Sequence, residues 1–495
     1  MNFPDQESFV HMADQSDLVP VYRTIIADLD TPLTIYAKIA DEQRHAFLFE
    51  SMEGGEKWGR YSFIGFDPLV NFTSNGSTVT VTRHGLEPFE KTISSVNPLH
   101  ELRELLASFN ASTAPGLPRF FGGAVGFLGY DMVRFIEEIP DSNPPLDIPD
   151  SSFMVPRLVL IHDAVQQQLT IVCNVVVGEG GNSRELYADA VQRIDEVVKL
   201  VRAPLPRSYT DEVPACARHE FTSNMDQPSF EAMVERAKEY ILAGDIIQVV
   251  LSQRFHTTTS LDPFLLYRSL RHINPSPYLF FLKMDDIILI GSSPEILVRL
   301  EDDDIELRPI AGTRQRGKTS EEDKALEEEL LADPKERAEH LMLVDLGRND
   351  VGRVAEGGSV TVDDLLIIER YSHVMHIVSG VHGKLASGHD QFDVLDASFP
   401  AGTVSGAPKI RAMEVIDELE SERRGPYAGA VGYFGFSGNM DFCITIRTFV
   451  MQGENLWVQA GAGIVADSVP QKEYEETINK AKGLRRAVEL AEEGF

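Results

Sequence analysis

A few charged side chains lie where they could act on a small anion. Glu339 falls within an apolar helical segment, where a carboxylate either faces water or needs a partner such as a metal ion. Glu476 precedes Lys480 at a helical spacing that is more typical of a surface ion pair. Arg447 ends an apolar strand, where it could bind a carboxylate with two hydrogen bonds or form an internal salt bridge. Individually, none of these residues identifies a reaction.

Three other features could belong to the same chemistry, although each has an ordinary structural interpretation. His376 would by default be a partly buried histidine, and Glu295 would by default be a turn residue after a Gly-Ser-Ser-Pro segment. The segment Gly461-Ala462-Gly463 is predicted to form a turn after the strand at 456–460, where backbone amides can approach an anion. Most turns of this kind only bend the chain.

Hydrophobic periodicity predicts the elements that must position these residues. Short alternating segments at 46–50, 77–82 and 168–172 indicate strands of a large antiparallel sheet. Helices are expected at 183–201, from about Ser229 to Gly244, after the capping residue Asp333, and from about Ser468 onward.

The strand predicted at 246–254 carries an unusual polar row. A period of two places Gln248, Ser252 and Arg254 on one face, opposite apolar residues. The simplest interpretation is a solvated side of the sheet. We expect two interlocked domains, residues 1–202 and 225–495, joined by a Pro-rich linker at 203–224.

Composition excludes several classes of partner. The 45 basic and 77 acidic residues give a formal charge of −32, which repels nucleic acid and an anionic membrane surface. An anionic substrate would therefore need a local basic group or a metal. The N-terminus has no signal-peptide pattern, no apolar run is long enough to cross a bilayer, and the 3 cysteines are too scattered for a disulfide framework. We expect a cytoplasmic protein.

The order of the motifs resembles that of the chorismate-utilising enzymes, and within them the anthranilate synthase component I family. The resemblance runs from about Ser229 to the C-terminus and includes the loop 308–314 and the segments 339–350, 399–409 and 476–480. Aminodeoxychorismate synthases typically carry a nucleophilic lysine where this chain has Ala311. Isochorismate and salicylate synthases typically carry a water-activating lysine where it has Gln248. The family pattern usually has alanine at the position of Gly347.

The resemblance implies that chorismate and ammonia give anthranilate and pyruvate, the first step of tryptophan synthesis. Glu339 and Glu476 would bind Mg²⁺, and Glu295 would be the general acid, with a pKa that neighbouring carboxylates should raise. His376 would lie against the ring and assist hydroxyl departure and the later elimination, and Gln248 would belong to the same reaction centre. The implied substrate contacts are Gly312, Thr313, Thr403, Tyr427, Arg447, Gly461, Ala462, Gly463 and Lys480.

The resemblance also implies a partner and an inhibitor. No cysteine lies in a Gly-x-Cys-x-Gly elbow, so ammonia from glutamine would come from a separate glutamine amidotransferase subunit. Tryptophan would bind across the two domains, and the implied inhibitor contacts are Glu50, Ser51, Pro277, Tyr278, Leu279 and Tyr433. The implied fold is an α+β sandwich of two antiparallel β-sheets with helices packed outside. Alternative functions are an aminodeoxychorismate synthase component I and a non-catalytic tryptophan-binding subunit.

Overall fold

The computed structural model describes residues 2–40, 42–52, 59–84, 89–113, 115–177, 182–206, 219–371 and 374–494. Residues 207–218 of the predicted linker, including Cys216, lie outside this described part.

The described strands form one hydrogen-bonded network of 22 strands, in which neighbouring strands run antiparallel. The strands are β1 (Leu18–Ile26), β2 (His45–Glu50), β3 (Tyr61–Asn75), β4 (Thr78–Arg83), β5 (Phe89–Ser94), β6 (Gly123–Leu128), β7 (Ser151–Asp163), β8 (Gln168–Val176), β9 (Thr222–Ser223), β10 (Gln248–Thr258), β11 (Tyr278–Met284), β12 (Ile287–Ser293), β13 (Ile296–Glu301), β14 (Asp304–Leu307), β15 (Ile310–Gln315), β16 (Thr361–Arg370), β17 (Val374–Lys384), β18 (Gly406–Ala407), β19 (Ala430–Gly435), β20 (Met440–Ile444), β21 (Thr448–Gln452) and β22 (Asn455–Ile464).

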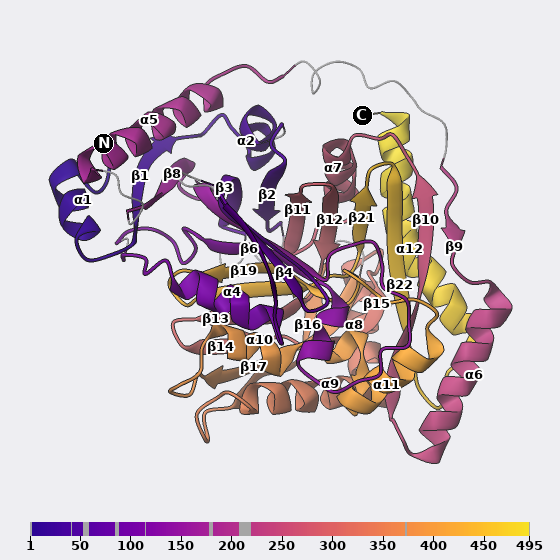
Figure 1. Ribbon diagram of the computed structural model, residues 1–495. Helices are drawn as coiled ribbons and strands as arrows, with labels where there is room; N and C mark the ends of the chain where they lie inside the picture. Colours follow the sequence, from indigo (N-terminus) through magenta and orange to yellow (C-terminus); the bar gives the residue numbers. More distant parts are fainter. Residues whose placement is uncertain are drawn as a thin grey trace.

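Helices cover the outside of this network (Figure 1). They are α1 (Gln6–Ala13), α2 (Pro32–Ile39), α4 (Pro98–Ala107), α5 (Ser183–Val201), α6 (Gln227–Ala243), α7 (Pro263–Ile273), α8 (Ser320–Ala332), α9 (Pro334–Gly352), α10 (Gln391–Ser398), α11 (Lys409–Leu419) and α12 (Pro470–Glu493), with short 3-10 turns η1 (Tyr130–Phe135) and η3 (Gly402–Val404). In Figure 1, α1 and α5 flank β1 and β8, α2 lies beside β2 and β3, and α6 and α12 flank β10 and β22. The predicted α+β fold, with antiparallel strands inside and helices outside, is confirmed.

The sequence signals at helix ends act as expected. Asp333 caps α9 by accepting hydrogen bonds from the amides of Lys335 and Glu336 at 2.9 and 3.3 Å, while Pro334 occupies the first turn. Gly244 ends α6 in a left-handed conformation with φ of 84°. The predicted helix at 183–201 coincides with α5.

Strands from the two halves of the chain pair with each other. β2 pairs with β11 along its length, and β6 pairs with β19. The backbone hydrogen bonds therefore continue across the boundary at which we divide the chain, and the division into two domains stays a prediction. Large aromatic residues, including Phe47, Phe120 and Phe127, fill the core between these shared strands.

Three local predictions were wrong. Gln248 and Ser252 are buried and do not lie on a solvated face, because other side chains cover this side of β10. Gly461 and Gly463 lie within β22, paired with β10, and do not form a turn. The glycines keep the strand regular while leaving room beside it. Arg447 lies beyond the end of β20 in a left-handed conformation with φ of 50°.

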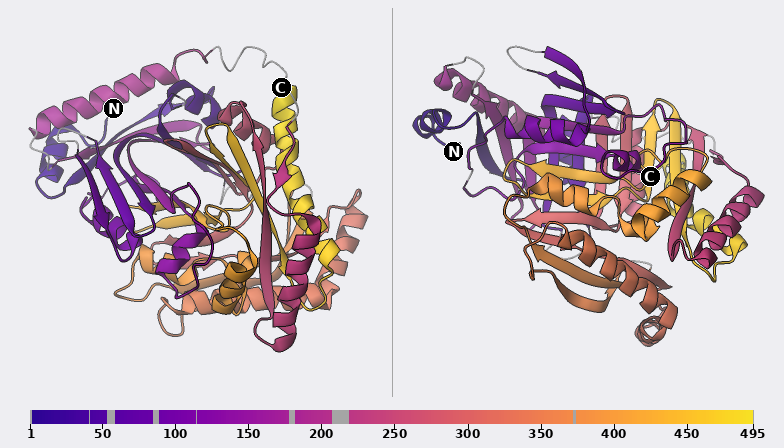
Figure 2. Two further views of the ribbon diagram at one scale, coloured as in Figure 1. Left: turned by 45° about the vertical axis from the view of Figure 1, so that its right-hand side comes forward. Right: turned by 60° about the horizontal axis from the view of Figure 1, so that its bottom comes forward.

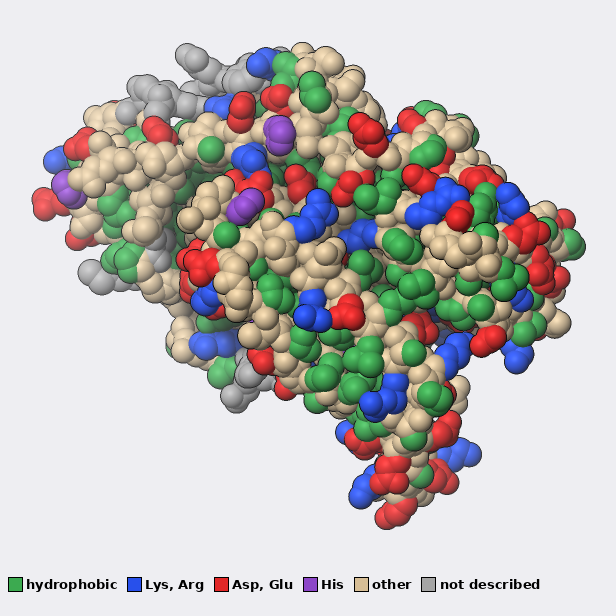
Figure 3. All heavy atoms as spheres, turned by 90° about the horizontal axis from the view of Figure 1, so that it is seen from below, with side chains coloured by type: hydrophobic (Ala, Val, Ile, Leu, Met, Phe, Trp, Pro, Cys, Tyr) green, Lys and Arg blue, Asp and Glu red, His purple; other side chains and the backbone are tan. Residues whose placement is uncertain are grey.

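The segment that carries α8, α9, β16 and β17 projects from the body of the molecule (Figure 2, right). Seen from below, the tip of this projection carries both acidic and basic side chains (Figure 3). Among the described helices, none is long and apolar enough to span a bilayer.

Gly347 gives a stability prediction. It lies inside α9, and an added Cβ would meet Pro309 and Val381 at 3.5 and 3.6 Å, which is ordinary van der Waals contact. Because glycine weakens a helix interior, Gly347→Ala should raise the free energy of unfolding by about 0.5–1 kcal/mol. Urea denaturation measures this change. The matched variant Gly244→Ala should lower stability, since φ is +84° there; an unchanged or lower midpoint for Gly347→Ala would contradict the argument.

Candidate active site

One cavity of about 600 Å³ brings together nearly all the residues predicted for the reaction. The predicted residues that line it are Gln248, Glu295, Gly312, Thr313, Glu339, His376, Thr403, Tyr427, Arg447, Gly461, Gly463, Glu476 and Lys480. Its volume is in the range of small-molecule sites. Ala462 does not line the cavity, because strand alternation turns its methyl group into the hydrophobic core opposite the two glycines.

His376 is held by the strand beside it. β17 pairs with β15, and the pairing shifts register at Gly312, whose φ of 68° a side chain would strain. His376 Nδ1 lies 3.1 Å from the Gly312 carbonyl and 3.0 Å from Thr313 Oγ1. A carbonyl only accepts, so Nδ1 carries the proton and Nε2 keeps a lone pair. Burial lowers the pKa of His376 to about 4, which keeps the ring neutral.

Glu295 has the properties of a carboxylic acid that is protonated near neutrality. Burial raises its pKa to about 7, against the opposing effects of the Thr403 hydroxyl and of the charges on Arg447 and Lys480. The predicted direction is confirmed, but the predicted cause was wrong. Desolvation raises the pKa here, and the nearest charged groups are cations.

The cations and the glycines occupy a common wall. The positive charge of Arg447 acts to lower the pKa of both Glu295 and His376. The Arg447 carbonyl accepts a hydrogen bond from the Ser292 amide at 3.2 Å. Lys480 Nζ donates to the Gly461 carbonyl at 2.8 Å. A Cβ on Gly461 would come within 2.7 Å of the Tyr427 hydroxyl, so only glycine leaves that hydroxyl in place.

Several carboxylates gather in the cavity next to Lys480. Burial raises the pKa of Glu339, and the charges of Glu336 and Glu476 raise it further. Gln248 Nε2 donates to Glu339 at 3.4 Å, and Lys480 forms an ion pair with Glu476 at 2.8 Å. These carboxylate oxygens, close enough to repel one another, suit a hard cation such as Mg²⁺. Within the described ranges, no group of at least 3 His, Cys, Asp or Glu side chains could hold a metal, so water and substrate would have to complete the coordination.

Three charged cavity residues were not assigned to the site from the sequence. Lys335, Glu336 and Glu473 also line it. Each glutamate lies three positions before a predicted metal ligand, on the same face of α9 or α12. This spacing could have indicated from the sequence that Glu336 and Glu473 lie near the proposed metal ligands.

A second, smaller pocket of about 70 Å³ contains all the residues predicted for the inhibitor. Those residues are Glu50, Ser51, Pro277, Tyr278, Leu279 and Tyr433. Glu50 is buried and accepts hydrogen bonds from the guanidinium of Arg271 at 3.0 and 3.1 Å and from the Tyr267 hydroxyl at 2.6 Å. The halves of this pocket come from the paired strands β2 and β11.

The two described cysteines are unsuited to nucleophilic catalysis. Cys173 and Cys443 are buried within strands. Burial raises the pKa of the Cys173 thiol to about 12 and also raises that of Cys443, so both stay protonated.

Comparison with known proteins agrees with this geometry. Residues 44–486 match the family model of the chorismate binding enzymes. The chain is 49% identical to anthranilate synthase component 1 of Aquifex aeolicus over 97% of both chains, and 46% identical to that of Acetivibrio thermocellus over 100% of both.

Solved structures give the same result. Anthranilate synthase component I from Streptococcus pneumoniae superposes with a TM-score of 0.76 at 37% identity, covering 93% of this chain and 99% of that one. The isochorismate synthase MenF from Escherichia coli, with a TM-score of 0.71 at 21% identity, shares the fold. The chain therefore belongs to the chorismate-binding enzymes and, within them, to the anthranilate synthase component I family, which converts chorismate to anthranilate in tryptophan biosynthesis.

Proposed function

We propose that the 600 Å³ cavity performs this reaction with ammonia as nucleophile, Glu295 as general acid and His376 as general base. The observation that carries the proposal is the pair of opposite shifts within one cavity. Burial raises the pKa of Glu295 to about 7 and lowers that of His376 to about 4. A protonated acid and an unprotonated base therefore coexist near neutral pH.

The negative charge of chorismate supports its proposed placement in this cavity. Chorismate carries two carboxylates, and Arg447 and Lys480 are cations that line the cavity of a strongly acidic chain. Arg447 can bind the enolpyruvyl carboxylate with two hydrogen bonds, with the amides near Gly461 and Gly463 beside it. Thr313, Thr403 and Tyr427 would contact the remainder of the substrate.

Glu295 would protonate the departing C4 hydroxyl while ammonia adds at C2, because hydroxide is a poor leaving group. His376 Nε2, as an unprotonated acceptor, would then take the C2 proton as the enolpyruvyl group leaves as pyruvate. This base role is more specific than the general assistance we expect from the sequence. It follows from the Gly312 carbonyl, which fixes the proton on Nδ1.

The cavity favours ammonia over a protein or water nucleophile. Ala311 has no lone pair, which argues against an aminodeoxychorismate synthase. The amide of Gln248 donates to Glu339 and has no basic nitrogen with which to activate water. An external amine is the remaining nucleophile.

Mg²⁺ fits the acidic side of the cavity, where Glu339 and Glu476 would hold it. When bound, the ion would neutralise a substrate carboxylate and the crowded glutamates. The charges of Glu336 and Glu476 raise the pKa of Glu339, which supports this assignment, since a dication would relieve that repulsion.

Ammonia would come from a separate glutamine amidotransferase subunit, a component II to this component I. Both described cysteines are buried, protonated thiols, so neither suits glutamine hydrolysis. Reduced thiols are also in keeping with a cytoplasmic location.

The second pocket would bind tryptophan as a feedback inhibitor. Glu50 supplies a buried carboxylate for the inhibitor's ammonium group, and aromatic side chains such as Tyr278 and Tyr433 surround the space. The existing partners of Glu50, Arg271 and Tyr267, hold its carboxylate in place.

Replacing the proposed acid tests the chemistry. Glu295→Gln should lower kcat by about 10²–10⁴-fold, because the amide cannot donate a proton to the leaving hydroxyl. Anthranilate fluorescence measures the rate. In the wild type, kcat/KM for chorismate at constant unprotonated ammonia should fall as pH rises through about 7, since the acid form is lost there.

Glu295→Gln should abolish this descending limb. The exposed Glu489→Gln on α12 is the matched control and should keep both rate and profile. A Glu295→Gln enzyme that retained the wild-type rate would exclude Glu295 as the acid. An exclusive isochorismate or aminodeoxychorismate product from the wild type would overturn the proposed function itself.

Removing a proposed metal ligand separates the enzyme from a non-catalytic tryptophan-binding protein. Glu339→Gln should lower magnesium-dependent turnover by about 100-fold or more and weaken activation by Mg²⁺. Calorimetry should show tryptophan binding near the wild-type level, because the inhibitor pocket is separate. Glu328→Gln, exposed on α8, should change neither property. Full activity of Glu339→Gln would contradict the metal assignment.

The inhibitor pocket has its own test. Glu50→Gln should raise the tryptophan concentration for half-inhibition by at least about tenfold, because the ammonium group loses a charged acceptor. Turnover without tryptophan should remain close to wild type. A tryptophan titration measures both, with Glu104→Gln on the exposed side of α4 as control. Unchanged inhibition would exclude Glu50 from the site.

A further inference from the structure

A buried ion pair behind the cavity has no role in the chemistry assigned above. Glu420 follows the end of α11, and Arg424 lies four residues later, with side chains only 5% and 1% exposed. Arg424 Nε and Nη2 donate to the two carboxylate oxygens of Glu420 at 2.9 and 2.6 Å. Desolvation largely offsets the attraction within such a pair, so stability alone is a weak account of it.

The pair replaces a missing strand along one edge of β10. β18 pairs only with the first residues of β10, and β9 pairs only with residues near its other end. Between them, Arg424 Nη2 donates to the Val250 carbonyl at 2.6 Å, and the Ser252 amide donates to Glu420 at 2.8 Å. Side chains thus satisfy buried backbone groups that a strand would otherwise pair.

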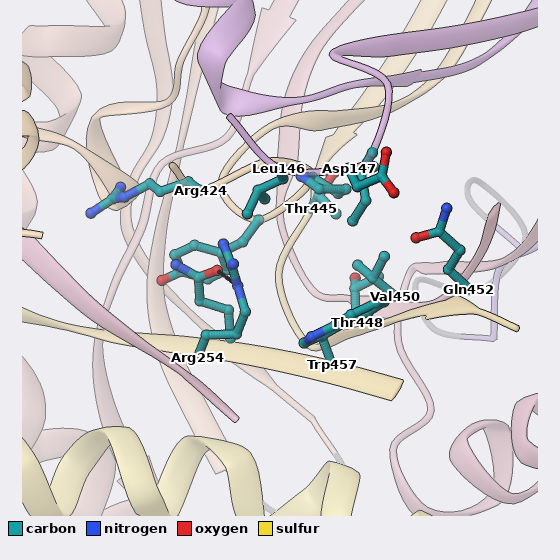
Figure 4. A pocket seen from close by; sticks show the side chains of 13 residues that line it. Leu146, Asp147, Arg254, Arg424, Thr445, Thr448, Val450, Gln452 and Trp457 are labelled. Atoms are coloured by element: carbon teal, nitrogen blue, oxygen red, sulfur yellow. Dashed lines mark hydrogen bonds between the residues drawn. The ribbon is translucent and has the colours of Figure 1, made fainter. Parts of the chain in front are cut away.

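Arg424 also holds two other parts of the cavity wall. Its Nη1 donates at 2.7 Å to the carbonyl of Val404, the residue after Thr403 in η3. Its guanidinium lies 5.6 Å from the ring centre of Tyr427. In Figure 4 the Arg424 side chain points away from the other labelled residues of a small pocket beside the cavity.

Glu420 reaches a fourth part of the wall through Ser252. The Ser252 hydroxyl donates to Glu420 at 2.8 Å and accepts from Gln459 Nε2 at 2.9 Å. Gln459 lies in β22, two residues before Gly461, and lines the cavity.

We propose that Arg424 and Glu420 are positioning residues for the anthranilate reaction, which fix β10, η3, Tyr427 and β22 relative to one another around the substrate. The inference rests on the proposed function. Through these contacts the pair sets where Thr403 lies beside Glu295 and where Gln248 lies beside Glu339. Neither residue of the pair lines the main cavity, so neither is a catalytic residue.

A charge-free double variant tests the proposal. Arg424→Met with Glu420→Gln leaves no unpaired buried charge, and glutamine can still accept from Ser252. Misplacement of reacting groups by about 1 Å should lower kcat about 100-fold. KM for chorismate should change less than kcat, by about 10-fold at most, since the pair positions Tyr427 and β22 but lies outside the main cavity and carries no charge that the substrate meets. Steady-state anthranilate formation is the measurement, normalised to folded protein.

The control removes an ion pair far along the chain from the cavity. Lys38 Nζ donates to Asp30 at 2.7 Å, with side chains 11% and 19% exposed, and neither residue lines the cavity. Lys38→Met with Asp30→Asn also removes both charges of a pair and should keep kcat. Equal kcat in the two double variants would overturn the positioning role. Absence of anthranilate from the wild type would instead refute the proposed function.

A single variant keeps the test decisive if the first double variant does not fold. Arg424→Lys keeps the charge beside Glu420 but cannot reach Val404, Val250 and both carboxylate oxygens together. We expect a folded enzyme with kcat about tenfold below wild type and an unchanged KM. Wild-type kcat in a folded Arg424→Lys enzyme would show that the guanidinium geometry is not needed, and would overturn the proposal.

Discussion

Electrostatic repulsion is the constraint on which the site depends. A chain with a formal charge of −32 must hold a dianion in a cavity that also contains Glu336, Glu339, Glu473 and Glu476. The cavity offsets this repulsion with Arg447 and with Lys480, which forms an ion pair with Glu476 at 2.8 Å, and a dication would balance the remaining carboxylates.

Burial, more than charge, sets the pKa values of the proposed acid and base. Glu295 and His376 feel the same cation, Arg447, yet their pKa values move in opposite directions from their usual values, because desolvation disfavours the charged form of each. The carbonyl of Gly312 then fixes which imidazole nitrogen can accept a proton. The direction of the Glu295 shift was predicted from the sequence, but its cause and the tautomer of His376 come from backbone placement, which the types of the residues do not show.

Sequence reasoning was most reliable where local signals dominate. Asp333, Pro334 and Gly244 mark helix ends, and α5 begins and ends where hydrophobic periodicity places it. It failed where long-range packing decides the outcome. The polar face of β10 is buried because Glu420 and Arg424, which lie about 170 residues later in the chain, bind to it. No pattern within 246–254 predicts these contacts. The Gly461 segment suggested a turn because glycine is weak in strands, but here the close approach of Tyr427 requires it.

The shared strands join the proposed inhibitor pocket and the main cavity through backbone hydrogen bonds. β11, which carries Tyr278, pairs with β12, and Tyr278 lies opposite Ser293, just before Glu295 in sequence. β20, which also borders the pocket, is tied to the Glu295 carbonyl through the Ile444 amide at 3.0 Å. These backbone hydrogen bonds give a displacement of either pocket a direct route to the other. Variants that lose the proposed feedback inhibition but keep full turnover should therefore be sought among side chains that point into the small pocket, with the backbone of these two strands unchanged.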